Sequence, residues 1–89
     1  MFDAETIENI LVGKAISDLL NEGFQAHVEH HEDGYTWVYA SEDGRMPRGG
    51  YKYWIKFMAG NGADALVDYT TNLEDILKPV NALAASMMK

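Results

Sequence analysis

The sequence predicts a single α+β domain in which a helix, a four-stranded antiparallel meander and a second helix follow one another, with both helices packed on one sheet face. Three observations predict this fold. Apolar residues recur at helical spacing near both ends of the chain, they alternate with polar residues in the middle, and turn residues separate the alternating segments. Because 89 residues support one core, residues 1–89 are expected to form one domain.

The first predicted element is a helix over residues 4–22. Asp3 is suited to cap its start and Gly23 to end it. Its apolar residues recur every three or four positions: Ile7, Ile10, Leu11, Ala15, Ile16, Leu19 and Leu20. Because Ile10 and Leu20 fall on opposite flanks of the main apolar face, we expect this helix to be covered on two sides, with a second subunit as one candidate cover.

Two strands joined by a tight turn are predicted next. Apolar and polar residues alternate over 24–31, which is the period of a half-buried strand, and residues 35–40 are the returning strand. The Asp-Gly pair at 33–34 tolerates the positive φ of a two-residue type I′ turn, which would place Val28 opposite Tyr39. In that register the face expected to meet the core carries Ala26, Val28, Trp37 and Tyr39.

Two further strands and a helix complete the predicted order. Residues 41–50 hold three glycines and a proline and form a long loop, and residues 51–58 alternate as a third strand. Residues 63–69 are most simply a fourth strand, although the same run also fits a helix. Thr71 and Glu74 match a capping box that opens an amphipathic helix.

The composition excludes several classes of protein. The chain has no cysteine, so it has no disulfide framework, no thiolate metal site and no cysteine nucleophile. Acidic residues stand near the N-terminus where a secretory signal carries basic ones, and no apolar run reaches membrane-spanning length. These features predict a cytoplasmic protein that does not enter a membrane.

The charge is unevenly distributed along the chain. Seven basic and 14 acidic residues give a net charge of −7, which favours basic partners. Residues 45–56 nevertheless contain four basic residues and no acidic one, so the remainder of the chain carries −11. The sequence therefore predicts a basic strip on an acidic body.

Neither a metal site nor a catalytic site is predicted. On a strand, His30 faces away from His27 and His31, and those two lie about 13 Å apart, which is too far for one metal ion to bridge. The serines lie in no nucleophile motif, and the glycine-rich run at 60–65 lacks the parallel βαβ unit that binds dinucleotides. We therefore expect a protein without enzymatic activity and without a cofactor.

The basic strip supplies the candidate binding residues, because basic and aromatic side chains interleave there: Arg45, Arg48, Tyr51, Lys52, Trp54 and Lys56. Tryptophan, tyrosine and arginine commonly anchor protein interfaces, which favours a protein-binding or regulatory function. One form of this hypothesis is an inhibitor of a nucleic-acid-processing protein, whose basic groove the acidic body would occupy.

An alternative hypothesis uses the same strip differently. Basic groups hold phosphates and aromatic rings stack on bases, so the strip also fits a nucleic-acid-binding protein. Homodimerisation, through the open sheet face or the first helix, is the companion expectation to both functions.

Overall fold

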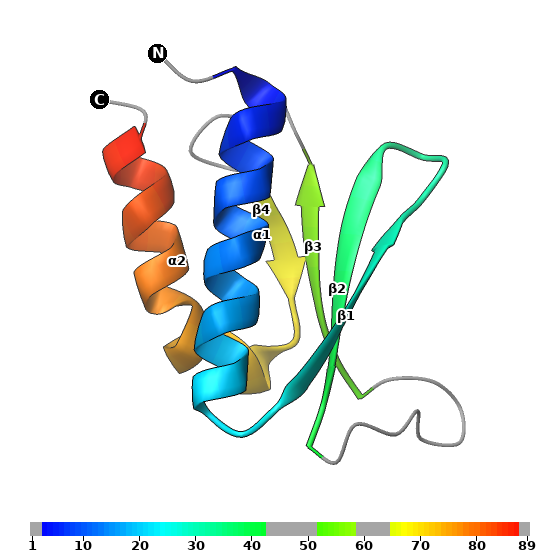
Figure 1. The fold of residues 1–89 in the computed structure, drawn as a ribbon, viewed down its shortest axis with the longest axis vertical. Helices are drawn as coiled ribbons and strands as arrows, with labels where there is room; N and C mark the ends of the chain where they lie inside the picture. Colours follow the sequence, from blue (N-terminus) through cyan, green and yellow to red (C-terminus); the bar gives the residue numbers. More distant parts are fainter. Residues whose placement is uncertain (1–2, 43–51, 59–64, 88–89) are drawn as a thin grey trace.

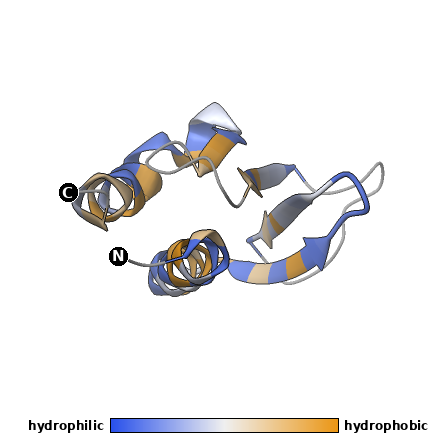
Figure 2. Ribbon diagram, turned by 90° about the horizontal axis from the view of Figure 1, so that it is seen from above, coloured by the Kyte–Doolittle hydropathy of each residue, from blue (hydrophilic) through white to orange (hydrophobic). Residues whose placement is uncertain are grey.

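A computed structural model describes residues 3–42, 52–58 and 65–87 and confirms the predicted architecture (Figure 1). The elements are α1 (Ala4–Asn21), β1 (Gln25–His30), β2 (Tyr35–Ser41), β3 (Tyr53–Met58), β4 (Leu66–Tyr69), the 3₁₀ turn η2 (Thr71–Leu73) and α2 (Glu74–Met87). The strands form one antiparallel sheet in the order β1-β2-β3-β4. Within the described ranges, both helices pack on one sheet face and neither covers the other face (Figure 2).

Helix α1 starts and ends as its sequence predicts. The Asp3 carboxylate accepts a hydrogen bond of 2.7 Å from the Thr6 backbone N–H, and this bond lowers the pKa of Asp3. At the other end Gly23 has a φ of +93°, which lets the Phe24 N–H donate to the Leu19 carbonyl at 3.0 Å. These caps fix the direction in which the chain enters β1.

One side of α1 supplies the helical half of the core. The side chains of Leu11, Ala15 and Leu19 are fully buried. Ile10 and Leu20, on the flanks, are 37% and 50% exposed. The described part of the chain therefore covers α1 on one side, and the predicted second cover is not found within it.

The β1–β2 hairpin differs from its prediction by one residue. The His31 N–H donates to the Tyr35 carbonyl at 2.9 Å, and the Gly34 N–H donates to the His31 carbonyl at 3.1 Å. Three residues therefore form the loop, and Gly34 alone among them has a positive φ, of +91°. Asp33 does not take the left-handed conformation that a type I′ turn needs; its carboxylate accepts a bond of 3.0 Å from the Tyr35 N–H.

The longer loop changes which side of β2 meets the core. Val28 lies opposite Val38 instead of Tyr39, and Glu29 lies opposite Trp37. A shift of one residue turns every side chain of a strand to the other face. Ala26 and Val28 still pack on the core as predicted. The prediction that Trp37 and Tyr39 share that face is wrong, because Thr36, Val38 and Ala40 take their place.

Replacing Gly34 with alanine is expected to destabilise the protein by about 1–2 kcal/mol, because L-residues disfavour the left-handed conformation. An added Cβ would meet only the Met58 Cε at 3.8 Å, so the cost lies in the backbone. Urea unfolding of G34A measures it. Gly13→Ala is the control: it lies in α1 with nothing within 4 Å of an added Cβ, and it should stabilise the helix by about 0.5–1 kcal/mol. An unchanged midpoint for G34A would contradict the three-residue loop.

Strands β3 and β4 follow the predicted pattern over shorter ranges. Tyr53, Ile55 and Phe57 are buried, and the residues between them face the other side of the sheet. Residues 66–69 are a strand and not a helix, whereas residues 63 and 64 lie outside the described part of the chain. The pairing between β3 and β4 is irregular between Lys56 and Phe57.

Helix α2 begins at Glu74, later than expected from a capping box with Thr71 as its first residue. Thr71 lies inside η2, and the residue before this turn is Thr70. The Thr70 hydroxyl accepts a bond of 3.3 Å from the Trp54 N–H, and the Thr70 N–H donates to the Trp54 carbonyl at 3.1 Å. Pairing with β3 therefore anchors the start of the helix. Its predicted apolar stripe is confirmed, since Leu73, Leu77, Val80 and Ala84 are fully buried.

The length and the charge of each described helix determine whether it could span a membrane. Helix α1 has 18 residues and helix α2 has 14, and both carry charged side chains. Within the described residues, neither is apolar enough over a sufficient length to cross a bilayer.

Candidate functional site: the open sheet face

The sheet face opposite the helices carries a group of large aromatic side chains. Strand β2 contributes three of them at alternate positions, and β3 contributes one aromatic residue and one lysine. We call this surface the aromatic face and define it as Tyr35, Trp37, Tyr39, Trp54 and Lys56. All five side chains are half-buried although no described helix covers them, because they pack on one another.

Trp37 lies at the centre of the aromatic face. Its ring centroid is 5.9 Å from that of Tyr39, with the planes stacked at 9°, and 5.3 Å from that of Trp54. The His31 ring lies 5.6 Å away on another side. These separations are typical of favourable aromatic pairs, so the rings hold one another in place before any ligand arrives.

The Trp37 indole N–H has no acceptor among the described residues. Its Nε1 is buried and makes no hydrogen bond within the described part of the chain. A buried donor without a partner costs about 1–3 kcal/mol, so a carbonyl or carboxylate that reached it would gain stability. The aromatic face therefore contains a buried donor that has no partner within the described part of the chain.

The aromatic face already holds one cation. The Lys56 ammonium lies 3.9 Å from the centroid of the Tyr35 ring and 5.4 Å from that of Trp37. A positive charge at such distances is attracted by the electron-rich ring faces. The ring arrangement is thus suited to basic side chains as well as to apolar contact.

An acidic group borders the aromatic face on β1. Glu29 lies opposite Trp37, with one carboxylate oxygen 3.3 Å from His27 Nε2 and the other 3.8 Å from His31 Nε2. Burial, and then the Glu29 charge, raises the pKa of Tyr39, so its phenol remains neutral at physiological pH. On β4, Asp68 lies opposite Lys56 in the strand register.

The histidines are divided between the two faces, as the alternation predicts. His30 faces the core side, with its Nδ1 3.0 Å from the Thr36 hydroxyl, whereas His27 and His31 flank Glu29. Within residues 3–42, 52–58 and 65–87, no three histidine or carboxylate side chains are arranged to hold a metal ion.

The structure brings together part of the predicted binding set. Trp54 and Lys56 lie on the aromatic face, whereas Lys52 is exposed with its ammonium 5.5 Å from the Tyr53 ring centroid. Three members of the set lie outside the described residues: Arg45, Arg48 and Tyr51.

Sequence reasoning missed the β2 half of the site. Tyr35, Trp37 and Tyr39 occupy every second position, which places them on one face of any strand. The signal that could have found them is the size of the intervening residues, because Thr36, Val38 and Ala40 are small enough for a helix to pack closely.

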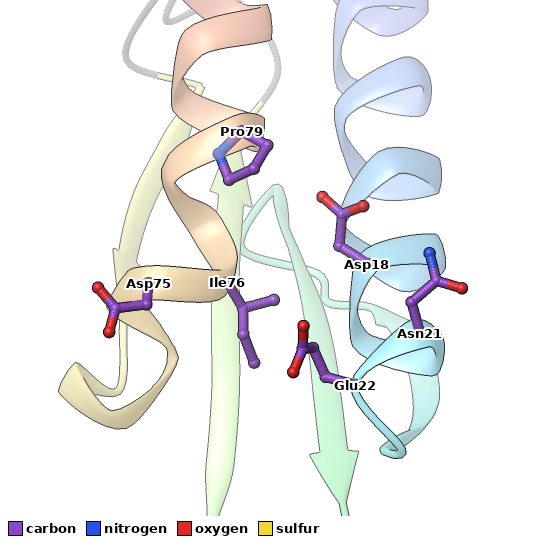
Figure 3. Close-up of a pocket in the computed structure, with 6 residues that line it drawn as sticks. All are labelled: Asp18, Asn21, Glu22, Asp75, Ile76 and Pro79. Atoms are coloured by element: carbon purple, nitrogen blue, oxygen red, sulfur yellow. The ribbon is translucent and has the colours of Figure 1, made fainter.

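A hollow of about 190 Å³ lies between the end of α1 and the start of α2 (Figure 3). It is lined by Asp18, Asn21, Glu22, Asp75, Ile76 and Pro79. One oxygen of Asp18 accepts from the Lys14 ammonium at 3.0 Å, and the other is buried without a hydrogen-bond partner among the described residues. Its lining therefore carries three carboxylates, those of Asp18, Glu22 and Asp75.

Comparison of the chain with protein-family models, with curated proteins and with solved structures gave no match.

Proposed function

We propose that this protein has no enzymatic activity and binds a basic segment of a partner protein on its aromatic face. The observation that carries the proposal is the Lys56 ammonium, which lies 3.9 Å from the Tyr35 ring centroid on a face that no described helix covers. A partner's arginine or lysine side chains could lie on the neighbouring rings in the same way.

The aromatic residues favour a protein partner. Tryptophan and tyrosine are enriched among residues that carry most of the binding energy at protein interfaces. Here Trp37 already contacts Tyr39 and Trp54, so binding would immobilise few additional side chains. Such preorganisation leaves more of the contact energy available for affinity.

The charges favour a basic partner over a nucleic acid. The chain carries a net charge of −7, and Glu29 and Asp68 lie on the same side of the sheet as Lys56. A nucleic acid would bring a row of phosphates toward these carboxylates, whereas a basic peptide would be attracted to them. Electrostatic attraction of this kind also speeds association.

A basic partner surface suggests the regulatory role. Proteins that process nucleic acids present basic grooves to phosphates, and a compact acidic protein can occupy such a groove. We therefore propose that the protein acts as an inhibitor or regulator that excludes nucleic acid from its partner. Competition between this protein and an oligonucleotide for the partner would be its functional signature.

The chain provides its own probe for this proposal. Its two tryptophans, Trp37 and Trp54, are both on the aromatic face, so tryptophan fluorescence, excited selectively over that of tyrosine, reports on this surface. Titration with an arginine-rich peptide should give a saturable change that weakens as salt is added. A change with a single-stranded oligonucleotide but not with the peptide would instead support the nucleic-acid alternative, and no change with either would contradict both.

Lys56→Gln is expected to raise the affinity for the arginine-rich peptide about two- to fivefold, because it removes a like charge worth up to about 1 kcal/mol from the binding surface. The same substitution should lower the affinity for an oligonucleotide, because a phosphate contact is lost. Fluorescence titration measures both. The control is Lys78→Gln on α2, which makes the same change in net charge on a side chain that pairs with Asp75. A loss of peptide affinity in K56Q would contradict the proposal.

A further inference from the structure

One lateral edge of the sheet is formed by β1, all six residues of which pair with β2 in an unbroken register. The His31 N–H bonds to the Tyr35 carbonyl, so in an antiparallel ladder Glu29 and His27 also direct their backbone groups toward β2. The N–H and C=O groups of Ala26, Val28 and His30 then point away from the sheet. No other described strand lies beside them.

The two sheet edges differ in how well they resist pairing with another chain. Strand β4 has only four residues, and an irregularity interrupts its pairing with β3. Strand β1 is longer and regular, and its sequence Gln-Ala-His-Val-Glu-His contains no lysine, proline or glycine. Charged side chains (above all lysines), prolines, bulges and short length are the usual features that keep edge strands apart. Of these, strand β1 has only one carboxylate, that of Glu29.

We propose that β1 pairs with β1 of a second copy of this chain, giving a two-fold symmetric dimer with one continuous eight-stranded sheet. In an antiparallel pair, backbone groups that point outward must meet groups that point outward. A two-fold axis at Val28 satisfies this condition, because it places Val28 opposite the second copy's Val28 and Ala26 opposite the second copy's His30. The arrangement forms about six backbone hydrogen bonds.

The side chains select this register. With the axis at Val28, His27 lies opposite the second copy's Glu29, and Glu29 opposite the second copy's His27. Within one copy, Glu29 already lies 3.3 Å from His27 and 3.8 Å from His31. Moving the axis to Glu29 would bring two carboxylates together, and like charges directly opposite destabilise a sheet. Moving it to His27 would lose both cross-strand pairs between a histidine and a carboxylate.

The dimer would enlarge the binding surface. A two-fold axis perpendicular to the sheet keeps the same face of both copies on one side. The two aromatic faces would therefore lie on one side of the continuous sheet, with the helices of both copies on the other. The dimer does not depend on the proposed function, because its tests use no ligand.

A charge exchange tests the pairing. His27→Glu places only carboxylates at positions 27 and 29, and the double variant His27→Lys with Glu29→Lys places only ammonium groups there. Sedimentation should find the natural chain as a dimer of the 10.0 kDa protomer and each variant alone as a monomer. An equimolar mixture of the two variants should restore a dimer, because every cross-strand pair then joins opposite charges. Circular dichroism checks that each variant is folded.

Hydrogen exchange locates the interface. The amides of Ala26, Val28 and His30 should be protected in the dimer and lose protection on dilution, whereas the Glu29 amide should stay protected at every concentration. A natural chain that remains monomeric at all concentrations would overturn the proposal. So would a dimer in which these three amides exchange freely, or a mixture of the variants that stays monomeric.

Discussion

Replacing Trp37 with alanine is expected to weaken binding of the arginine-rich peptide at least about 30-fold. Truncation of a central interface residue commonly costs about 2 kcal/mol or more, which corresponds to this change in affinity. Trp37 contacts the rings of Tyr39, Trp54 and His31 and lies within reach of the Lys56 charge, so its loss removes both contact area and the support of its neighbours.

The fluorescence of the remaining Trp54 allows the same titration in the variant. Leu20→Ala is the control, because Leu20 is 50% exposed and belongs to α1, which packs on the sheet face opposite the aromatic face (Figure 2). It should leave the peptide affinity unchanged. If W37A bound the peptide as tightly as the natural chain, the binding surface would lie elsewhere.

The order of the elements could be predicted because capping residues and the spacing of apolar residues indicate the type and the bounds of each element. Asp3 and Gly23 mark the ends of α1, and the Leu73, Leu77, Val80 and Ala84 stripe marks the buried side of α2. Such signals depend on neighbours in sequence and on backbone preferences. Strand length was less well predicted, because a strand ends where its pairing ends, and pairing depends on the other strands.

The register of the hairpin could not be predicted from the same signals. Asp-Gly is compatible with a two-residue loop and also with a three-residue loop that ends in a left-handed glycine. The sequence of β2 fits either loop length, because both faces of the strand are apolar. Trp37 and Tyr39 lie on one face, and Val38 and Ala40 lie on the other. In the structure the smaller side chains, Val38 and Ala40, face the core, where α1 packs against the sheet.

The candidate site was half predicted for the same reason. Trp54 and Lys56 were placed correctly, because alternation along β3 is independent of the hairpin. Tyr35, Trp37 and Tyr39 were missed, because large aromatic residues are normally expected to be buried. Four large aromatic residues, the three of β2 and Trp54, lie on this open face, which is one reason why we propose a binding role for it.

Phe57→Ala is expected to destabilise the protein by about 3–5 kcal/mol, the usual cost of removing a fully buried phenylalanine. Phe57 is 0% exposed and lies on a central strand, where it meets the core formed with α1 and α2. The total stability of a domain of this size is about 5–15 kcal/mol, so most of it could be lost. Urea unfolding measures the change, and Phe57→Leu provides a milder variant if the alanine form does not fold.

The same measurement on Trp37→Ala tests the hairpin register. In the structure Trp37 lies outside the core and is only partly buried, so its truncation should cost clearly less stability than that of Phe57, despite removing a larger side chain. With a two-residue loop, Trp37 would instead face the helices, and the two costs would be similar. A large loss of stability in W37A would therefore favour the register that the turn residues alone predict. A small loss combined with weakened peptide binding is the result expected of a side chain retained for recognition.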